Sequence, residues 1–259
     1  MLFRKNKLTK ADIKLIPRSF DTVGDIIIFS DFPESLKKKE KLIGEYLLII
    51  HKRVKTITKK TQNYSGRYRI PKLKVLAGEK DLETIHKENG IKLKVNPEKA
   101  YFSPRTSTER LRVAKQVKRG NDVLVMFSGV MPFGLTIAKH SKANEICGIE
   151  INPKAHKYAE ENVGLNKINN IRLIQGDVNK VMPKKKFDKI IMPLPKTSEK
   201  YLDLALKHLK TKGKVYLYVF EKEENFKKLK EKYKKFKPKL VKAGTPSPGK
   251  YRVCVELKK

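Results

Sequence analysis

The sequence predicts an α/β protein, with a Rossmann-like domain of parallel strands behind a small α+β domain. From Asp122 onward, apolar runs alternate with helical patterns, which is typical of a parallel sheet covered by helices on both faces. Residues 122–152 read as a strand, a small-residue turn, a helix and a second strand that ends at Glu150. Upstream, Asn89 and Gly90 lie between two alternating segments and predict a type I′ hairpin.

The composition favours a nucleic-acid partner. The 259 residues include 61 Lys and Arg against 27 Asp and Glu, a formal net charge of +34. Such an excess creates a long-range positive field that attracts nucleic acid or an anionic membrane. A lysine-rich composition also arises in hot-adapted or AT-biased genomes, but that bias would raise glutamate as well. The number of acidic residues is not raised to match the number of lysines, so we favour nucleic-acid binding.

Other classes are disfavoured. The apolar runs, such as residues 46–50, are much shorter than the ~20 residues of a membrane span. The first ten residues lack the apolar segment of a signal peptide. Two cysteines, expected on buried strands, and five scattered histidines show no zinc-ligand spacing. We expect a cytoplasmic monomer with no membrane contact and no metal.

The first hundred residues predict a basic segment at 1–19 and the small α+β domain at 20–100. An apolar strand covers residues 26–29, and a helix with one apolar face covers residues 33–51. A short strand follows at residues 53–57.

Residues 59–74 predict a basic loop. The segment holds six basic residues and no acidic one, and Ser65 and Gly66 interrupt its periodicity. Its cations can meet phosphates while Tyr64 or Tyr68 stacks on an unpaired base. A solvated loop without a ligand is the alternative. As substrate contacts in this loop, we select Lys59, Lys60, Arg67 and Tyr68.

The segment at 100–120 predicts a helix with a glutamate in its first turn. Pro104 lies before the helix, and Thr106 or Ser107 can cap it, which places Glu109 in the first turn. A glutamate at this position is usually a capping or dipole-compensating residue. The catalytic domain is predicted over residues 101–259.

Acidic residues end successive predicted strands. Gly129 lets the backbone approach a ligand, and Glu150 at the next strand end can chelate ribose hydroxyls. The GxGxxG pattern of nicotinamide cofactors is absent, and the looser turn suits S-adenosylmethionine. Asp177 follows the third strand and can hold the adenine amino group of the same ligand. A βαβ unit without a ligand is the alternative.

Two prolines follow the fourth strand. Pro193 and Pro195 stiffen the backbone and expose carbonyl groups to the cleft, although a proline-rich strand exit is also a common turn. The chain ends with a strand at residues 251–257, whose position after the last helix suits antiparallel insertion.

These motifs resemble those of the archaeal and eukaryotic tRNA (guanine-37, N1) methyltransferases and their wyosine-pathway relatives. The resemblance covers about residues 20–257 and rests on TIHKENG, YFSPR…ER, MFSGVMPF, IEINP and MPLPK. The family's versions of the last three are DMFAGVGPF, IDINP and MNLPK. The resemblance implies a class I S-adenosylmethionine-dependent methyltransferase domain behind a small RNA-binding domain, with tRNA as the partner.

The resemblance also implies residue roles. Glu109 matches the family's general base, and Arg69 matches its catalytic arginine. Removal of the guanine N1 proton needs a base, and charge developing on O6 needs a cation. The expected cofactor contacts are Arg110, Phe127, Gly129, Glu150, Asp177, Val178 and Leu194. The further expected substrate contacts are Arg105, Pro193, Pro195 and Lys196.

The chain departs from the family pattern at several positions. Val125 replaces the motif aspartate, Met131 replaces the second glycine, and Pro193 replaces the asparagine before Leu-Pro. The common part begins near residue 20, so we expect no separate N-terminal domain for the outer corner of tRNA. The pattern favours methyl transfer to N1 of guanosine-37, with carbon-7 methylation of the wyosine precursor also open. Aminocarboxypropyl transfer and an inactive tRNA-binding protein are the alternatives.

Overall fold

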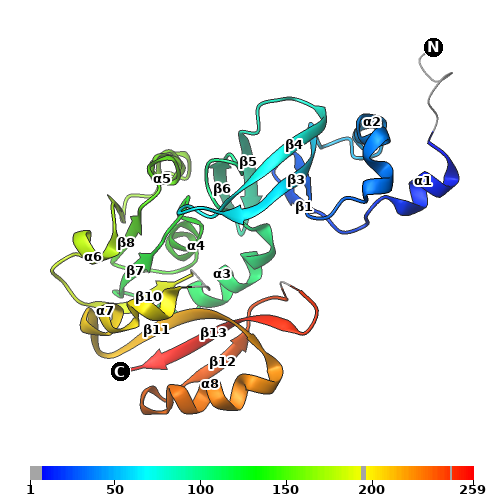
Figure 1. Cartoon of the computed structure of the whole chain (residues 1–259). Helices are drawn as coiled ribbons and strands as arrows, with labels where there is room; N and C mark the ends of the chain where they lie inside the picture. Colours follow the sequence, from blue (N-terminus) through cyan, green and yellow to red (C-terminus); the bar gives the residue numbers. More distant parts are fainter. Residues whose placement is uncertain (1–7, 194–196, 246) are drawn as a thin grey trace. The chain divides into compact units, whose positions relative to one another are not determined.

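The computed structural model describes residues 8–193, 197–245 and 247–259, without the side chains of residues 63–65. The chain divides into two compact units (Figure 1). The first comprises the chain up to Lys87 together with Lys92–Pro104, and the second comprises Glu88–Ile91 and Arg105–Lys259. Each unit has its own sheet, and each is described by itself.

The first unit contains a mixed sheet of strand order β1-β2-β3-β4 and a separate β5-β6 pair. Only β2 and β3 are parallel neighbours within the mixed sheet. The elements are α1 (Lys10–Leu15), β1 (Asp21–Val23), β2 (Ile26–Phe29), a 3-10 helix (Glu34–Lys39), α2 (Glu40–Ile50), β3 (Thr56–Ser65), β4 (Ile70–Gly78), β5 (Thr84–Glu88) and β6 (Ile91–Val95).

Helix α2 covers the mixed sheet and completes a small apolar core. Ile43 and Leu47 of α2 are buried with Phe29 of β2 and Ile57 of β3. The predicted strand at 26–29 and helix at 33–51 are therefore confirmed, although the first part of the helix is a 3-10 helix. The predicted basic segment at the N-terminus contains α1, which begins after a capping box at Thr9.

The prediction of a loop over residues 59–74 was wrong. Most of this segment lies in β3 and β4, which pair in antiparallel register with Lys59 opposite Lys74. Parallel pairing with β2, where Phe29 lies opposite Lys59, holds β3 in the sheet. The segment is polar because it lies on a strand pair with solvent-exposed positions, and tertiary pairing overrides its weak strand propensity. Only the connection between the strands is a turn.

The hairpin predicted at Asn89-Gly90 is present. Asn89 has φ of 46° and Gly90 has φ of 71°, as the two central residues of a type I′ turn require. The hairpin joins β5 to β6, and its tip belongs to the second unit.

The second unit contains a larger sheet of order β12-β13-β11-β10-β7-β8-β9. Strands β7 to β11 pair in parallel, whereas β13 is antiparallel to both of its neighbours, β11 and β12. This confirms the prediction of a final antiparallel strand inserted in the sheet. The short edge strand β12 was not predicted, because four residues rich in lysine carry little strand signal.

The elements of the second unit follow one another as strand and helix. They are a 3-10 helix (Pro104–Thr106), α3 (Ser107–Ala114), β7 (Asp122–Met126), α4 (Pro132–His140), β8 (Glu145–Glu150), α5 (Pro153–Leu165), β9 (Ile171–Gln175), α6 (Val178–Val181), β10 (Phe187–Met192), a 3-10 helix (Ser198–Tyr201), α7 (Leu202–Lys207), β11 (Leu209–Lys222), 3-10 helices at Glu223–Asn225 and Lys234–Phe236 around α8 (Phe226–Lys232), β12 (Lys239–Lys242) and β13 (Lys250–Lys258).

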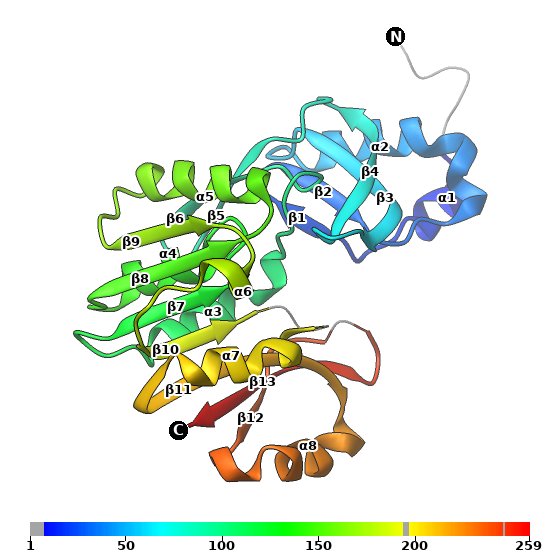
Figure 2. The ribbon, with the colours of Figure 1, turned by 60° about the vertical axis from the view of Figure 1, so that its left-hand side comes forward.

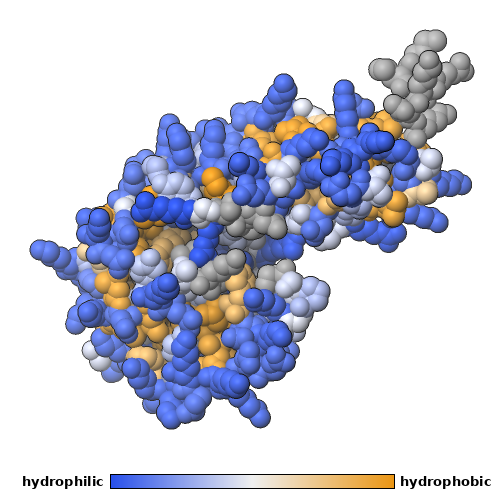
Figure 3. All heavy atoms as spheres, viewed as in Figure 1, coloured by the Kyte–Doolittle hydropathy of each residue, from blue (hydrophilic) through white to orange (hydrophobic). Residues whose placement is uncertain are grey.

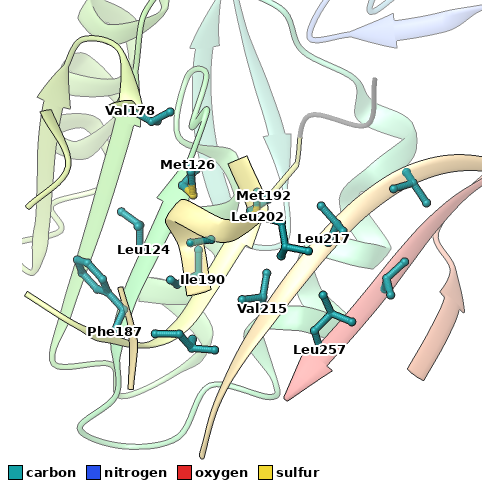
Figure 4. Packing of buried hydrophobic residues seen from close by; sticks show 14 of the residues in the cluster. Leu124, Met126, Val178, Phe187, Ile190, Met192, Leu202, Val215, Leu217 and Leu257 are labelled. Carbon is teal, nitrogen blue, oxygen red and sulfur yellow. The ribbon is translucent and has the colours of Figure 1, made fainter. Parts of the chain in front are cut away.

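Helices cover both faces of this sheet, with α7 in front of the strands and α3 and α4 behind them in Figure 2. One apolar core lies under α7, where Leu124, Ile190, Val215 and Leu217 pack with Leu202 (Figure 4). On β11 the alternate residues Tyr216 and Tyr218 are therefore on the opposite face, toward α3. This face carries the polar network described below.

Hydrophilic side chains cover much of the face shown in Figure 3, in keeping with the high lysine content. Within the described part of the chain, no helix has the length and apolar character needed to cross a bilayer. The same residues contain no group of three or more His, Cys, Asp or Glu side chains that could hold a metal ion.

Candidate cofactor and catalytic site

The turn after β7 holds the carboxylate of Glu150 at the end of β8. The Gly129 amide donates to Oε2 at 2.7 Å, and the Asn152 amide donates to Oε1 at 2.7 Å. The Ser128 amide also donates to the Ile149 carbonyl at 2.9 Å, which fixes the turn against β8. Burial raises the pKa of the Glu150 carboxyl, while the backbone donors oppose this shift. The carboxylate is thus fixed at the carboxyl edge of the sheet, where ligands bind in this architecture.

The same turn contains three residues with left-handed backbone. Phe127, Gly129 and Met131 have φ of 58°, 56° and 68°. Such conformations are uncommon for residues other than glycine, and they cluster at ligand sites. The ring of Phe127 makes an edge contact with Tyr201, at 5.1 Å between centroids. Phe127 and Gly129, both predicted cofactor contacts, therefore lie in one constrained turn beside Glu150.

Met131 and Val125, the two departures from the family motif, are fully buried. The Met131 side chain lies over two glycines, Gly134 of α4 and Gly148 of β8. A Cβ atom on Gly134 would lie 2.1 Å from Met131 Cε, and one on Gly148 would lie 2.6 Å from Met131 Sδ. The methionine is accommodated because both neighbours lack side chains.

The predicted contacts after β9 and β10 differ in accessibility. Asp177 is partly exposed and caps α6 by accepting a hydrogen bond from the Asn179 amide at 2.9 Å. Val178 is packed in the apolar core, and the residue is 3% exposed. Pro193 is half-buried after β10. The predicted contacts Leu194, Pro195 and Lys196 lie outside the described residues.

Glu109, the candidate base, lies in the first turn of α3 and is 6% exposed. Arg112 forms a two-bond ion pair with it, through Nε to Oε2 at 2.6 Å and Nη2 to Oε1 at 2.8 Å. The Tyr218 hydroxyl donates to Oε1 at 2.6 Å. The glutamate is therefore not an N-terminal cap, since no side-chain capping bond is present at this helix start.

The network continues to Glu256 on β13. Arg112 Nη1 donates to Oε1 of Glu256 at 2.5 Å, and Lys214 Nζ donates to Oε2 at 2.8 Å. Gln116 donates to Glu256 at 2.9 Å and accepts from the Tyr216 hydroxyl at 3.2 Å. These donors outweigh the effect of burial and lower the pKa of the Glu256 carboxyl to about 2.

Arg110, a predicted cofactor contact, forms a buried ion pair with Glu88. Its Nε and Nη2 donate to the two carboxylate oxygens at 2.6 and 2.5 Å, and its Nη1 donates to Thr106 Oγ1 at 2.5 Å. The tip of the hairpin is also held by Asn89 Nδ2, which donates to the Ser107 carbonyl at 2.8 Å. The structure thus gives Arg110 a role in holding the hairpin tip against α3. A contact with the cofactor remains a prediction.

Arg69 and four of the eight predicted substrate contacts lie in the first unit. Arg69 is in the turn between β3 and β4, where its amide donates to the Gly66 carbonyl at 3.3 Å, and burial lowers the pKa of its guanidinium. Arg67 and Tyr68 are exposed in the same turn. Arg105 is exposed in the second unit. The side chains of Arg67, Tyr68 and Arg105 thus lie at the surface.

Lys59 and Lys60 are held by neighbours within the first unit. Lys59 Nζ lies 2.5 Å from Oε1 of the buried Glu40, and Lys59 itself has a side chain only 13% exposed. Lys60 Nζ donates to Ser30 Oγ at 3.0 Å. Lys59 therefore balances a buried charge, which the sequence did not indicate.

Comparisons with known proteins identify the family of the chain. A family model described as the TRM5/TYW2 methyltransferase domain matches residues 84–242, more than half of the chain. The chain belongs to the TRM5/TYW2 methyltransferase family. A second model, the TYW2 N-terminal domain, matches residues 2–81. The methyltransferase match begins at Thr84, the first residue of β5, so it includes the whole hairpin.

Two curated relatives show how this TRM5/TYW2 chain compares in length. It is 43% identical over 210 residues to the tRNA (guanine(37)-N(1))-methyltransferase Trm5b of Pyrococcus abyssi, covering 81% of this chain and 62% of the relative. It is 34% identical over 251 residues to the tRNA(Phe) (4-demethylwyosine(37)-C(7)) aminocarboxypropyltransferase of Methanocaldococcus jannaschii, covering 92% and 97%. The chain thus spans less than two thirds of the length of the first relative and nearly all of the second.

The fold of this TRM5/TYW2 member agrees with solved structures of the family. A complex of aTrm5 and tRNALeu superposes with a TM-score of 0.84 at 35% identity, covering 96% of this chain and 74% of the other. The predicted fold class, an α/β methyltransferase domain with a small N-terminal domain, is confirmed.

Sequence reasoning missed several residues of the site. Tyr218, Arg112 and Glu256 surround the candidate base, and Glu88 pairs with Arg110. The spacing of Glu109 and Arg112, three residues apart on a helix, is the one available signal for an ion pair. Tyr218 is 109 residues from Glu109 in sequence, so only the register of the sheet against α3 reveals their contact.

Proposed function

We propose that the chain transfers a methyl group from S-adenosylmethionine to N1 of guanosine-37 in tRNA. The observation that carries the proposal is the fixed Glu150 carboxylate beside Gly129, at the edge where a nucleoside cofactor binds. The Pyrococcus relative is named for this reaction, and a neighbouring structure contains tRNALeu. Carbon-7 methylation of the wyosine precursor at the same position is a second methyl-transfer outcome.

The proposed roles follow from the charges that the reaction moves. Glu150 and Asp177 hold the ribose and adenine of the cofactor, with Phe127 and Gly129 in the adjoining turn. Glu109 accepts the guanine N1 proton, and Arg69 stabilises negative charge on O6. The residues present fit a nucleoside cofactor, because a buried carboxylate aligned by backbone amides is a suitable acceptor for ribose hydroxyls. The methyl transfer needs alignment of nucleophile, methyl and sulfur, and no metal.

The basic surface supports tRNA as the partner. The net charge of +34 and the exposed Arg67, Tyr68 and Arg105 suit phosphate contacts and base stacking. We further propose that the protein acts as a monomer in the cytoplasm.

Aminocarboxypropyl transfer is a second candidate, favoured by a specific observation. The N-terminal match is to the TYW2 domain, and the chain covers 97% of the aminocarboxypropyltransferase of Methanocaldococcus. Both reactions use the same cofactor and break different carbon–sulfur bonds. The altered motif at Val125 and Met131 lies in the strand and turn that would face the methionine end of the cofactor.

The deciding experiment uses cofactors labelled separately in the methyl and carboxypropyl carbons. Each is incubated with a guanosine-37 tRNA transcript, its N1-methylated form and a 4-demethylwyosine-containing tRNA. Methyl label at N1 of the first transcript supports the proposal. Carboxypropyl label in the third substrate establishes the second candidate. A protein that binds tRNA but transfers neither label is an inactive RNA-binding member.

A matched pair of variants checks the site. Glu150→Gln removes one acceptor of the proposed cofactor site, whereas Glu224→Gln alters a carboxylate exposed on the surface, with its side chain 69% accessible. Only the first should reduce incorporation of label. Equal loss in both variants would contradict the proposed cofactor site.

A further inference from the structure

The contacts of Glu109 use its two carboxylate oxygens unequally. Oε1 accepts from the Tyr218 hydroxyl at 2.6 Å and from Arg112 Nη2 at 2.8 Å, whereas Oε2 accepts only from Arg112 Nε at 2.6 Å. A carboxylate oxygen has about two acceptor positions. Oε1 is therefore saturated by these contacts, and Oε2 retains one position.

Both donors are themselves fixed. Tyr218 is 2% exposed on β11, and its ring packs against Phe133 of α4 at 5.8 Å between centroids. Burial raises the pKa of Tyr218 well above its usual value, so its hydroxyl remains a donor at neutral pH. Arg112 is held on its other side by Glu256, which is 3% exposed. The carboxylate is thus oriented from β11 and, through Arg112, from β13.

We propose that Tyr218 and Arg112 are positioning residues, which present Oε2 of Glu109 as the acceptor of the guanine N1 proton. This inference rests on the proposed function. The N1–H bond breaks and its proton moves to Oε2. The N1 electron pair forms the bond to the methyl carbon, and the methyl carbon–sulfur bond breaks with its electrons on sulfur. The sulfonium becomes a neutral thioether as the carboxylate becomes a neutral acid, so charge is balanced.

The pH dependence of this arrangement involves groups on three elements. Arg112 is on the same helix as Glu109, Tyr216 and Tyr218 face it from β11, and Cys254 and Glu256 lie on β13. Burial raises the pKa of the Cys254 thiol, so it is neutral near pH 7. Lys214 Nζ forms an ion pair with Oε2 of Glu256, the oxygen that Arg112 does not contact.

The test removes the hydroxyl of Tyr218 and compares this variant with the same change at a buried tyrosine outside the network. Tyr218→Phe deletes one donor to the ionised carboxylate, which makes the carboxylate easier to protonate. Tyr233→Phe deletes the hydroxyl of another buried tyrosine, which donates to the carboxylate of Glu199 and not to Glu109. Both variants keep the buried ring, so they differ mainly in the contact with Glu109.

Two measurements are made on the full chain. Carboxyl-¹³C glutamate labelling gives the titration midpoint of the Glu109 signal, assigned by its loss in Glu109→Gln. Single-turnover methyl transfer to the guanosine-37 transcript gives the pH–rate profile. In Tyr218→Phe we expect the midpoint and the acidic limb of the profile to move up by about one pH unit. The plateau rate should fall about tenfold from lost orientation, and Tyr233→Phe should match the wild type.

The outcomes separate this inference from the proposed function. An unchanged midpoint in Tyr218→Phe, or an equal shift in Tyr233→Phe, overturns the positioning role. A shifted midpoint with no label transferred to tRNA supports the orientation of Glu109 by Tyr218 and refutes methyl transfer. A lower rate with an unchanged pH profile would assign Tyr218 a structural role only.

Discussion

The side chain of Met131 occupies the space that a methyl group on Gly148 would need. A Cβ atom at Gly148 would lie 2.6 Å from Met131 Sδ and 3.2 Å from Leu173 Cδ2, and Met131 is fully buried. Met131, in the turn after β7, and Gly148, on β8, are therefore a coupled pair. This pairing explains how the chain tolerates a large residue where the family pattern has glycine.

We predict a measurable coupling between these positions. Gly148→Ala should destabilise by about 1–3 kcal/mol through overpacking, and Met131→Ala by about 2–5 kcal/mol through a cavity. The double variant should cost less than the sum by about 0.5–3 kcal/mol, because the added methyl enters the vacated space. Denaturant unfolding gives the free energy of unfolding of the wild type, the two single variants and the double variant. Gly164→Ala is the control, because Gly164 on α5 has open space around it. If the stability losses of the two single variants simply added in the double variant, the coupling of Met131 and Gly148 would be refuted.

Breaking the ion pair between Arg110 and Glu88 should strongly destabilise the second unit. Their side chains are 3% and 5% exposed, so Glu88→Gln leaves a buried cation without its counter-charge. We expect a loss of about 3–5 kcal/mol in the free energy of unfolding. The double replacement Glu88→Leu with Arg110→Met should recover much of this loss. Glu45→Gln, in an exposed pair with Lys41, should change stability by less than about 1 kcal/mol.

Glu256 should give stability that is lost in acid. Its folded pKa of about 2 lies below the ordinary value of 4.5, so its contribution is present above pH 4.5 and declines as pH falls toward 2. The stability difference between wild type and Glu256→Gln should be about 3 kcal/mol at neutral pH. That difference should narrow between pH 5 and pH 3. A constant gap over this range would show that the carboxylate is not held ionised by Arg112 and Lys214.

Cofactor affinity should depend on the ionisation of Glu150. Burial raises the pKa of this carboxyl, so protonation should weaken S-adenosylmethionine binding at a higher pH than an ordinary glutamate would. Calorimetry should show that Glu150→Ala lowers affinity about 10- to 100-fold and removes this acid dependence. Asp203→Ala, a surface change in the first turn of α7, is the control. Equal affinity in Glu150→Ala and wild type would place the cofactor elsewhere.

Two cations of the β3–β4 hairpin should behave differently. Arg67 is exposed in the turn, so Arg67→Ala should weaken tRNA binding and reduce the log–log salt slope by about one. Lys59 is paired with Glu40, so Lys59→Ala should mainly lower stability. Filter binding at several salt concentrations, with thermal unfolding of each variant, distinguishes the two effects. A salt-slope change in Lys59→Ala with unaltered stability would reverse these assignments.

The local parts of this site were predictable from sequence, because they follow chain order. Glu150 ends a strand and Gly129 lies in the preceding turn, so parallel strands bring them to one edge. The Asn89-Gly90 turn needs only two residues with positive φ. The final antiparallel strand follows from its position after the last helix.

The remaining contacts depend on long-range register. Tyr218 reaches Glu109 because alternate residues of β11 face α3, and nothing in the sequence near either residue indicates that pairing. The basic segment at residues 59–74 has a loop-like composition, and only the pairing of β3 with β2 and β4 identifies it as part of two strands. The ion pair of Arg110 with Glu88 was likewise not predicted, because the two residues lie in different motifs, 22 residues apart.

The hairpin tip has a consequence for how the protein can be divided. The chain passes between the two units after Lys87, after Ile91 and after Pro104, so no single cut separates them cleanly. A fragment starting at Arg105 would bury Arg110 without Glu88 and expose the Ser107 carbonyl that Asn89 covers. A fragment that retains both contacts must begin at Glu88 or earlier. Proteolytic cleavage within the segment between β6 and α3 should therefore leave the two pieces associated through the contacts of the hairpin tip with α3.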